Sequence, residues 1–284
     1  MVKLIAIDMD GTLLTPNHTI SERNIAAIQR AKEEGIEVVI ATGRAYNDAR
    51  EIVESTGLEL PFICLNGALI INDTKEVLNS LRIAPNLIKE IASELDSEML
   101  HYNVYTDKTV YTTSVEDEIE QYQLFIEAMG GDINADERVK ARVEKGYLVE
   151  VEDFAEVYQR EDEVVLKYLA KSSNRANLQR SQTYFNAIEG LYATSSGPGN
   201  IEVTAKGAQK GKALGVLCER MGITMDDCMA IGDNYNDLSM LKRAGTSVVM
   251  GNAAIDIKSY ADIVVGSNVE DGVAEAIEGI LNRK

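Results

Sequence analysis

Short apolar runs of strand length alternate with helix-like patterns at both ends of this 284-residue chain. Near the N-terminus the apolar runs lie at residues 3–7, 37–41 and 61–65. Beyond residue 200 they lie at residues 201–204, 228–231, 247–250 and 263–265. Strands that alternate with helices form βαβ units, whose strands pair in parallel. The sequence therefore predicts an α/β fold with a doubly wound, Rossmann-like parallel sheet.

The middle of the chain has a different character. It contains nine of the twelve tyrosines, and its candidate strands at 100–105, 164–170 and 191–196 alternate polar with apolar residues. Such alternation is typical of a sheet with one solvated face. We therefore expect an inserted α+β domain at 85–199, with 196–199 as the return hinge, and a core domain formed by 1–84 and 200–284.

Composition excludes several classes of protein. The net charge of −18 disfavours binding to nucleic acid or to acidic membrane surfaces, because these require a positive face. No apolar run approaches the ~18 residues of a membrane span, and Asp8 and Asp10 interrupt the N-terminal apolar stretch, which does not read as a signal peptide. Three cysteines without paired spacing argue against disulfides or thiolate zinc, and two histidines cannot build a multi-histidine site. We expect a soluble cytoplasmic protein that captures any anionic ligand through local groups.

Polar residues follow the ends of several predicted strands: Asp8, Thr42, Asn66, Asp233 and Asn252. In a parallel α/β sheet, ligands bind outside the carboxyl ends of the strands, near the point where the strand order reverses. A random scatter of polar residues would not coincide with five strand ends. The sequence therefore predicts one shared active site at this edge of the sheet.

The segment 8–12, Asp-Met-Asp-Gly-Thr, is the most distinctive of these elements. Two carboxylates just beyond an apolar strand repel each other and call for a cation, and hard oxygen ligands with open water positions suit Mg²⁺. With the metal present, one carboxylate can attack phosphorus while the other transfers a proton. For the pair of Asp8 and Asp10 alone, an acidic turn that caps a strand is an equally good reading.

A second acidic element at residues 232–237 repeats this arrangement at another strand end. Asp233 can supply a further metal carboxylate. Asn236 and Asp237 open the following helix, where polar residues are also ordinary capping groups. Taken beside Asp233, however, they are candidates for the same site.

A captured phosphate also needs positive groups or free backbone N–H groups. The segment 42–44 lies at a strand-to-helix turn, which suits a phosphate seat, and Arg44 is open to two readings, contact with substrate or a surface ion pair. Lys210 opens a predicted helix and can offset charge on the transferring phosphoryl group. Lys206 and Lys212 are nearby alternatives to Lys210.

Four motifs, taken in order, resemble those of the haloacid dehalogenase (HAD) superfamily of phosphohydrolases. They are DMDGT at 8–12, ATGR at 41–44, the Lys-Gly pair at 210–211 and GDNYND at 232–237. Their order and spacing are similar to those of the Cof-type phosphatase branch, whose α/β cap is inserted between the second and third motifs. Supporting motifs of that branch occur at 65–68, 250–253 and 267–274. Tyr235 departs from the pattern, because relatives often carry a small or acidic residue there.

The resemblance implies roles for the acidic residues. Asp8 would form an aspartyl-phosphate, and Asp10 would protonate the leaving oxygen and then activate water. Mg²⁺ would be held by Asp8, the main-chain carbonyl of Asp10, and Asp233.

The resemblance also implies phosphate contacts from the Met9 N–H group and from Thr42, Gly43, Lys210 and Asn236. Asp237 would orient Lys210 or a metal-bound water. Arg44 and Asn66 would either support these phosphate-binding groups or contact the substrate. The inserted cap would close over the core, exclude water and select the leaving group.

The expected function is therefore Mg²⁺-dependent hydrolysis of small phosphomonoesters, with sugar phosphates as the first expected class. One alternative is a phosphatase of a phosphorylated cofactor such as flavin mononucleotide or pyridoxal phosphate. Another is a sugar phosphomutase, which would pass the phosphoryl group on and require a bisphosphate activator. A non-enzymatic alternative is a phospho-accepting signalling module, although such modules are much shorter.

Overall fold

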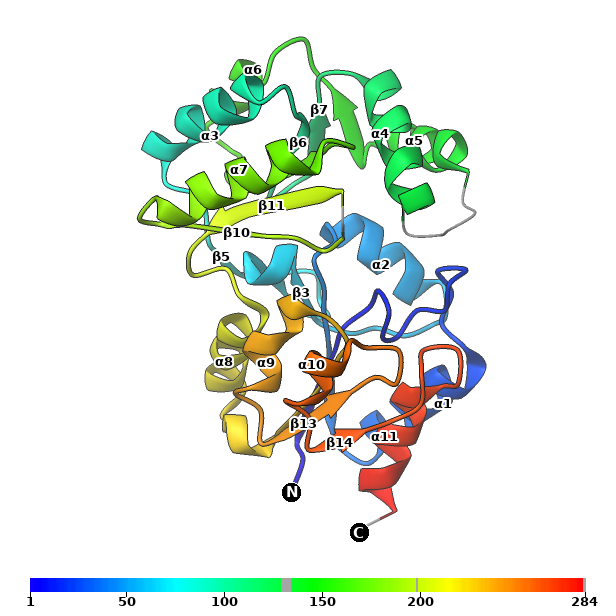
Figure 1. Ribbon diagram of the computed structural model, residues 1–284. Helices are drawn as coiled ribbons and strands as arrows, with labels where there is room; N and C mark the ends of the chain where they lie inside the picture. The colour runs from blue at the N-terminus through cyan, green and yellow to red at the C-terminus, as the bar shows by residue number, and fades with distance from the viewer. Residues whose placement is uncertain (129–133, 198, 283–284) are drawn as a thin grey trace. The chain divides into compact units, whose positions relative to one another are not determined.

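The computed structural model describes residues 1–128, 134–197 and 199–282 (Figure 1). The chain divides into two compact units. The first consists of Met1–Asn79 and Gln209–Lys284, and the second of Ser80–Ala208. The second unit is therefore an insertion into the first.

Among the described residues, the first unit is built on an eight-stranded sheet in the order β14-β13-β12-β1-β2-β3-β4-β5. Its strands are β1 (Leu4–Ile7), β2 (Glu37–Ala41), β3 (Phe62–Cys64), β4 (Leu69–Ile71), β5 (Val77–Ser80), β12 (Cys228–Gly232), β13 (Thr246–Val249) and β14 (Ile263–Val264). Neighbours from β14 to β3 are parallel, and β4 is antiparallel to β3. Because β1 pairs with β2 on one side and β12 on the other, the strand order reverses at β1. The doubly wound parallel sheet expected from the sequence is confirmed.

Helices and short 3₁₀ turns surround this sheet. They are α1 (Glu22–Glu33), α2 (Tyr46–Glu54), η1 (Leu65–Gly67), α8 (Lys210–Met221), η2 (Met225–Asp227), η3 (Tyr235–Asp237), α9 (Leu238–Leu241), α10 (Ile255–Lys258) and α11 (Gly272–Leu281). Every residue of β1 is buried. Leu4 and Ala6 share a core with Leu214 and Leu217 of α8. Burial on both faces explains why β1 reads as a continuous apolar run.

The second unit is built on a different kind of sheet. Within the described ranges it has six strands in the order β10-β11-β9-β6-β7-β8, antiparallel except for the parallel pair β7 and β8. The strands are β6 (His101–Thr106), β7 (Val110–Thr112), β8 (Leu148–Glu150), β9 (Val165–Lys171), β10 (Leu191–Thr194) and β11 (Asn200–Ala205). The helices are α3 (Pro85–Ser97), α4 (Val115–Ala128), α5 (Ala135–Glu144), α6 (Ala155–Tyr158) and α7 (Arg175–Ala187). An inserted α+β domain, as expected, is present.

One sheet face of the second unit is apolar. Tyr102, Val104, Tyr168 and Ala170 pack in a single core with residues of α3 and α7, including Phe185. The polar residues Asn103, Lys167 and Glu202 lie on the opposite face because side chains alternate along a strand, and they are buried as well, so this face is not the solvated one that the sequence suggests. This alternation is the pattern that the sequence shows for the middle of the chain.

The boundary of the insertion differs from the sequence-based expectation. Residues 200–208 belong to the second unit instead of the core, because β11 pairs antiparallel with both β10 and β9. Ile201 and Val203 enter the apolar core of the second unit. Residues 196, 197 and 199 lie between β10 and β11, so the predicted hinge is part of a strand connection; Pro198 lies outside the described residues. The two apolar residues Ile201 and Val203 predict a strand, but they do not indicate which of the two sheets that strand joins.

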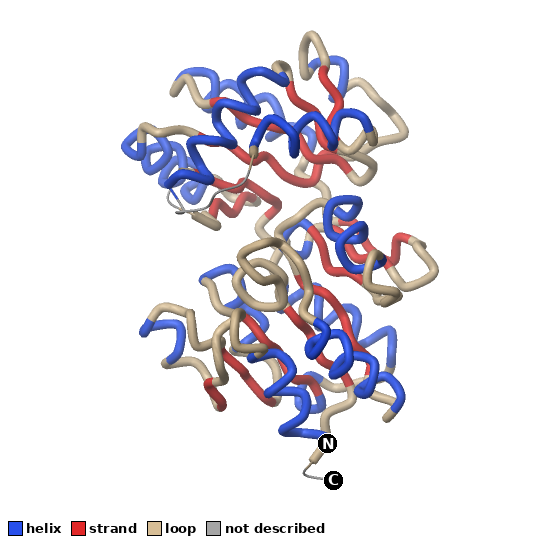
Figure 2. The backbone as a smooth tube through the Cα atoms, turned by 90° about the vertical axis from the view of Figure 1, so that its right-hand side faces the viewer, coloured by secondary structure: helices blue, strands red, loops and turns tan. Residues whose placement is uncertain are grey.

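The helices of both units are short (Figure 2). α4, in the second unit, has 14 residues. A helix that spans a bilayer needs about 20 predominantly apolar residues. In the described parts of the chain, no helix combines the length and the apolar character that a membrane crossing requires.

Candidate active site

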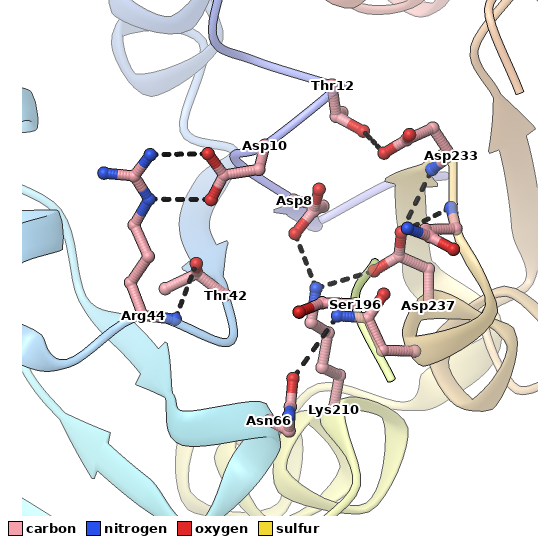
Figure 3. Close-up of polar contacts among 12 residues, drawn as sticks. Asp8, Asp10, Thr12, Thr42, Arg44, Asn66, Ser196, Lys210, Asp233 and Asp237 are labelled. Carbon is pink, nitrogen blue, oxygen red and sulfur yellow. Dashed lines mark hydrogen bonds and ion pairs between the residues drawn. The ribbon is translucent and has the colours of Figure 1, made fainter. Parts of the chain in front are cut away.

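The predicted site residues of the core come together at the carboxyl ends of neighbouring strands (Figure 3). Asp8 follows β1, Thr42 follows β2, Asn66 lies in η1 after β3, and Asp233 follows β12. These strands are adjacent in the sheet, with β1 between β2 and β12. The residues therefore meet where the strand order reverses, which is the usual ligand site of such sheets.

Lys210 is the centre of a buried charge cluster. Its ammonium is fully buried and donates to Asp8 Oδ1 at 2.5 Å and to Asp237 Oδ1 at 2.7 Å. Burial alone lowers the pKa of Lys210, but Asp237 and Asp8 outweigh it and raise the pKa above its ordinary value. Lys210 is therefore a permanent cation in contact with Asp8. The alternative lysines, Lys206 and Lys212, are exposed.

Asp237 uses both of its carboxylate oxygens within the protein. Oδ1 accepts from Lys210, and Oδ2 accepts from the backbone N–H groups of Asp233 and Asn234, each at 3.0 Å. A Cβ at Gly232 would lie 2.6 Å from the Asp237 carboxyl carbon, so this approach requires glycine. Asp237 therefore orients Lys210 and the turn after β12, and its oxygens are poorly placed to bind a metal directly.

The turn after β1 brings Asp233 close to Asp8. Gly11 has a φ of +83°, and a Cβ there would lie 2.4 Å from Asp233 Oδ2, so any side chain at this position would displace Asp233. The Thr12 hydroxyl donates to Asp233 Oδ1 at 2.9 Å and fixes its orientation. One oxygen each of Asp8, Asp233 and Asp237 lie within 4.8 Å of one another.

These carboxylates outnumber the cations around them. Burial and the charge of Asp237 raise the pKa of Asp8 well above its ordinary value, against the opposing effect of Lys210. Burial and Asp237 likewise raise the pKa of Asp233 to about 7. Raised carboxyl pKa values mean that the cluster lacks positive charge. Both oxygens of Asp237 already accept hydrogen bonds from the protein. Asp8 and Asp233 are therefore the carboxylates that suit a divalent cation with oxygen ligands.

Asp10 turns away from this cluster and pairs with Arg44 (Figure 3). Arg44 Nε donates to Asp10 Oδ2 at 2.7 Å and Nη2 donates to Oδ1 at 2.5 Å, which is a bidentate ion pair. The Asp10 side chain is 49% exposed; desolvation by its neighbours acts to raise its pKa, but Arg44 outweighs this effect and holds that pKa below its ordinary value. Of the two readings left open for Arg44, the structure shows an ion pair, and its partner is the candidate proton carrier.

Asn66 is carried by an unusual turn. Leu65, Asn66 and Gly67 have φ values of 51°, 57° and 102°, and a Cβ at Gly67 would lie 2.6 Å from the carbonyl oxygen of Gln209. A left-handed conformation costs a non-glycine residue roughly 1–2 kcal/mol. The Asn66 N–H donates to the Thr42 carbonyl at 3.0 Å, and Asn66 Oδ1 accepts from Asn236 Nδ2 at 3.3 Å. The turn therefore joins two predicted site residues through Asn66.

The remaining predicted phosphate contacts lie in the same turns. Met9 is buried between Asp8 and Asp10, and Gly43 lies in the connection between β2 and α2. The Thr42 hydroxyl is buried and accepts from the Arg44 N–H at 3.2 Å. A hydroxyl that accepts one hydrogen bond can donate another. A hydroxyl, an amide and an ammonium donor thus lie in the turns at this edge of the sheet, and the ammonium of Lys210 contacts Asp8 directly.

Comparison with known proteins gives the family. A family model described as haloacid dehalogenase-like hydrolase matches residues 5–277. The chain belongs to this hydrolase family. It is 35% identical over 286 positions to the phosphatase YwpJ of Bacillus subtilis (strain 168), covering 99% of this chain and 100% of YwpJ. The predicted resemblance to the HAD superfamily and its Cof-type branch is confirmed.

Two further relatives agree along nearly the whole chain. The 5-amino-6-(5-phospho-D-ribitylamino)uracil phosphatase YcsE of Bacillus subtilis (strain 168) is 32% identical, covering 97% of this chain and 94% of YcsE. A solved haloacid dehalogenase-like hydrolase from B. subtilis has a TM-score of 0.87 at 32% identity, covering 98% of this chain and 99% of that chain. The likeness therefore includes the inserted unit of this HAD hydrolase.

Sequence reasoning singled out Asn252 but did not predict that Asn252 and Asn268 tether the loop after β1 in this HAD hydrolase. Asn252 Nδ2 donates to the Gly11 carbonyl at 2.8 Å, while Asn252 Oδ1 accepts from the Asn268 N–H at 3.0 Å. Asn268 Nδ2 donates to the Leu14 carbonyl at 2.8 Å. Asn252 thus follows a strand end as expected, but its contacts are with the loop after β1. Asn252 lies in the supporting motif at 250–253 and Asn268 in that at 267–274, so these two motifs were the sequence features that could have indicated the tethers.

Proposed function

We propose that this chain is a Mg²⁺-dependent phosphatase that hydrolyses small phosphorylated metabolites through an aspartyl-phosphate on Asp8. The contact that carries the proposal is the buried one between Asp8 and Lys210, at the reversal point of the sheet. A carboxylate held against a permanent cation, in a cluster that still lacks positive charge, suits attack on a phosphate dianion. The phosphatase names of YwpJ and YcsE support the same reaction.

In the first half-reaction Asp8 attacks phosphorus and the bond to the leaving oxygen breaks. Lys210 offsets the charge that develops on the phosphoryl oxygens. Because Arg44 favours the ionised form of Asp10, Asp10 must take up a proton as the substrate binds, and it then gives that proton to the leaving oxygen. In the second half-reaction Asp10 takes a proton from water as the water attacks the aspartyl-phosphate. Free phosphate and the ionised Asp8 carboxylate result, so protons balance over the cycle.

The metal site uses residues that the structure brings together. Asp8 and Asp233 would hold Mg²⁺ with the main-chain carbonyl of Asp10, and Thr12 would fix Asp233 through its hydroxyl. The ion would supply the positive charge that the cluster lacks and draw the phosphate toward Asp8. This local charge also explains how a chain with a net charge of −18 can bind an anion.

Phosphate binding is assigned to donors around Asp8. We assign these contacts to the Met9 N–H group, Thr42, Gly43, Lys210 and Asn236. Asn66 supports Asn236 through its side-chain oxygen, and Asp237 supports Lys210. These two contacts limit the rotation of the Asn236 and Lys210 side chains.

For the substrate we propose phosphates of sugars or sugar alcohols, selected by residues of the inserted unit. The name of YcsE, which specifies a phosphorylated ribityl chain, supports this class. A phosphorylated cofactor such as flavin mononucleotide or pyridoxal phosphate remains the alternative substrate.

The test is a phosphate-release screen over several dozen phosphorylated metabolites, with Mg²⁺ and with EDTA. We expect release from sugar or polyol phosphates with Mg²⁺ and none with EDTA. Preference for a cofactor phosphate would reassign the substrate. Release that is unaffected by EDTA would contradict the metal assignment, and an isomerised sugar phosphate in place of free phosphate would indicate a mutase.

A further inference from the structure

His18 belongs to none of the sequence motifs, yet it lies beside the candidate proton carrier. It stands in a tight turn between Thr15 and Thr19. The Thr15 N–H donates to the Thr19 carbonyl at 2.9 Å, the His18 N–H donates to the Thr15 carbonyl at 2.9 Å, and the two threonine hydroxyls lie 2.9 Å apart. The turn gives His18 a left-handed φ of 55°.

The imidazole contacts Arg44 and lies near Asp10, with His18 Nδ1 3.7 Å from Asp10 Oδ1. His18 Nδ1 lies 2.9 Å from Arg44 Nη2. A guanidinium has only donors, so Nδ1 accepts this hydrogen bond and the ring proton resides on Nε2. The Arg44 side chain is 14% exposed, so few of its possible orientations point into solvent. The hydrogen bond to His18 Nδ1 therefore helps to fix the orientation of the Arg44 guanidinium.

Arg44 in turn fixes the Asp10 carboxylate. The same Nη2 that donates to His18 also donates to Asp10 Oδ1, and Nε donates to Oδ2. Two parallel hydrogen bonds from a planar fork set the plane of the carboxylate. Each carboxylate oxygen has a second lone-pair position, so a held carboxylate can still exchange a proton on its far side.

We propose that His18 is a positioning residue for proton transfer by Asp10, acting through Arg44. Its Nδ1 holds the guanidinium in the orientation that aims the Asp10 carboxylate at the leaving oxygen. The proton moves from Asp10 to that oxygen as the phosphorus–oxygen bond breaks, and His18 neither gains nor loses one. This inference rests on the proposed function, specifically on Asp10 as the proton donor.

The backbone of His18 supports a side-chain role. Glycine and asparagine adopt a left-handed φ with less strain than other residues, so the turn itself would be satisfied by either. Histidine tolerates this conformation as well, and the contact with Arg44 is what it adds to the turn. The same property supplies a matched pair of variants, because His18→Gly and His18→Asn both suit the turn, and asparagine alone keeps an acceptor close to the position of Nδ1.

The experiment compares two leaving groups. An alkyl phosphate has a basic leaving oxygen that must be protonated, whereas an aryl phosphate with an acidic phenol, such as p-nitrophenyl phosphate, needs no acid. We expect His18→Gly to lower kcat/KM for the alkyl phosphate about ten- to a hundredfold, the loss of one hydrogen bond to a charged group. We expect no change for the aryl phosphate, and His18→Asn should match the wild type on both substrates.

Other outcomes would overturn the inference. An alkyl-to-aryl ratio in His18→Gly equal to that of the wild type would show that His18 does not act on Asp10. Equal loss on both substrates, or failure of His18→Asn to restore the ratio, would show a structural role only. Asn17→Ala, an exposed neighbour in the same turn, serves as the control, and thermal unfolding of each variant checks that the fold is intact. If the wild type released phosphate from neither substrate, the proposed function would fail as well, which is a distinct result.

Discussion

Each unit of this protein buries a lysine against carboxylates. The carboxyl pKa values are raised in the cluster of the first unit and lowered in that of the second. In the first unit Lys210 meets Asp8 and Asp237, with Asp233 close by. In the second unit Lys171 donates to Glu118 Oε1 at 2.5 Å, and Glu118 Oε2 lies 3.0 Å from His101 Nε2. Both lysines and the carboxylates they contact are almost fully buried. The two clusters are therefore alike in burial and differ in charge balance.

The difference appears in the carboxyl pKa values. Burial raises the pKa of any carboxyl, and in the first unit this effect prevails, because one ammonium serves several carboxylates. For Glu118 the opposite holds, since Lys171 and His101 outweigh burial and bring its pKa below the ordinary value. At Lys171, burial prevails over Glu118 and lowers the pKa of the ammonium, so the lysine depends on this carboxylate to stay charged. The pair joins α4 to β9, and His101 extends it to β6. The cluster of the first unit keeps surplus negative charge, which favours the binding of a cation.

The largest expected effect is on catalysis by the first cluster. Asp8→Asn removes the nucleophile but keeps an oxygen that can accept from Lys210. We expect kcat to fall about 10⁴-fold or more, while the melting temperature is retained or raised because one surplus charge is gone. Phosphate release and thermal unfolding measure the two quantities. Normal turnover by this variant would contradict the role of Asp8.

Breaking the second cluster should affect stability and spare activity. Glu118→Gln leaves Lys171 buried beside a neutral group, which costs about 3–5 kcal/mol of unfolding free energy. The measurement is denaturant unfolding, with Glu116→Gln, an exposed residue of the same helix, as the matched control. A loss no larger than that of Glu116→Gln would mean that the Lys171–Glu118 pair is not the structural contact described above.

Magnesium should distinguish the clusters directly. At a Mg²⁺ concentration 100-fold above its Kd, we expect the wild type to gain about 2.7 kcal/mol of stability. Asp233→Asn should lose this gain, whereas Glu118→Gln should keep it on a lower baseline. Melting temperatures in Mg²⁺ and in EDTA give the comparison. Equal stabilisation of the wild type and Asp233→Asn would place the ion elsewhere.

The clusters should also respond to pH in opposite directions. In EDTA, Asp233 of the folded protein holds its proton up to about pH 7, against an ordinary value of 3.8. The folded state thus binds the extra proton between these values, and stability falls as pH rises through this window. Relative to the wild type, Asp233→Asn should gain roughly 2 kcal/mol by about pH 8 and nothing near pH 4, after allowance for partial exposure.

For Glu118 the sign reverses. Its lowered pKa contributes stability that is present above the unfolded value of 4.5 and is lost only as the pH falls below it. The wild-type advantage over Glu118→Gln should therefore be constant from neutral pH to about pH 5 and shrink in stronger acid. Unfolding in a pH series measures both differences. Parallel trends for the two variants would contradict the contrast in charge balance.

Much of the core could be predicted because its signals are local. A continuous apolar run such as β1 is buried on both faces, and the polar residue that ends it, Asp8, must lie at the sheet edge. The contacts that depend on distant partners could not be predicted in this way. Nothing near β11 indicates that it pairs with β9, and nothing near His18 indicates that Arg44 lies beside it.

The ion pair between Arg44 and Asp10 is another contact with a distant residue that could not be predicted from the sequence. Sequence alone left Arg44 between substrate contact and a surface ion pair, because its reach covers both. Only the folded turn after β1 brings the Asp10 carboxylate to its guanidinium. Similarly, the capping role that the sequence allows for Asp237 is present, since its Oδ2 accepts from the Asn234 N–H, but its contacts with Lys210 and with the Asp233 N–H depend on distant partners and on the close approach at Gly232.

The central claim is that Asp8 carries the phosphoryl group, and it can be tested by trapping that species. Asp10→Asn should slow hydrolysis of the intermediate, while an aryl phosphate with an acidic leaving group can still phosphorylate the enzyme without an acid. After an acid quench in the presence of Mg²⁺, we expect the peptide that contains Asp8 to gain the mass of one phosphoryl group, and the gain to vanish in EDTA. Phosphate on a different residue, or none on Asp8 while product is released, would contradict the claim.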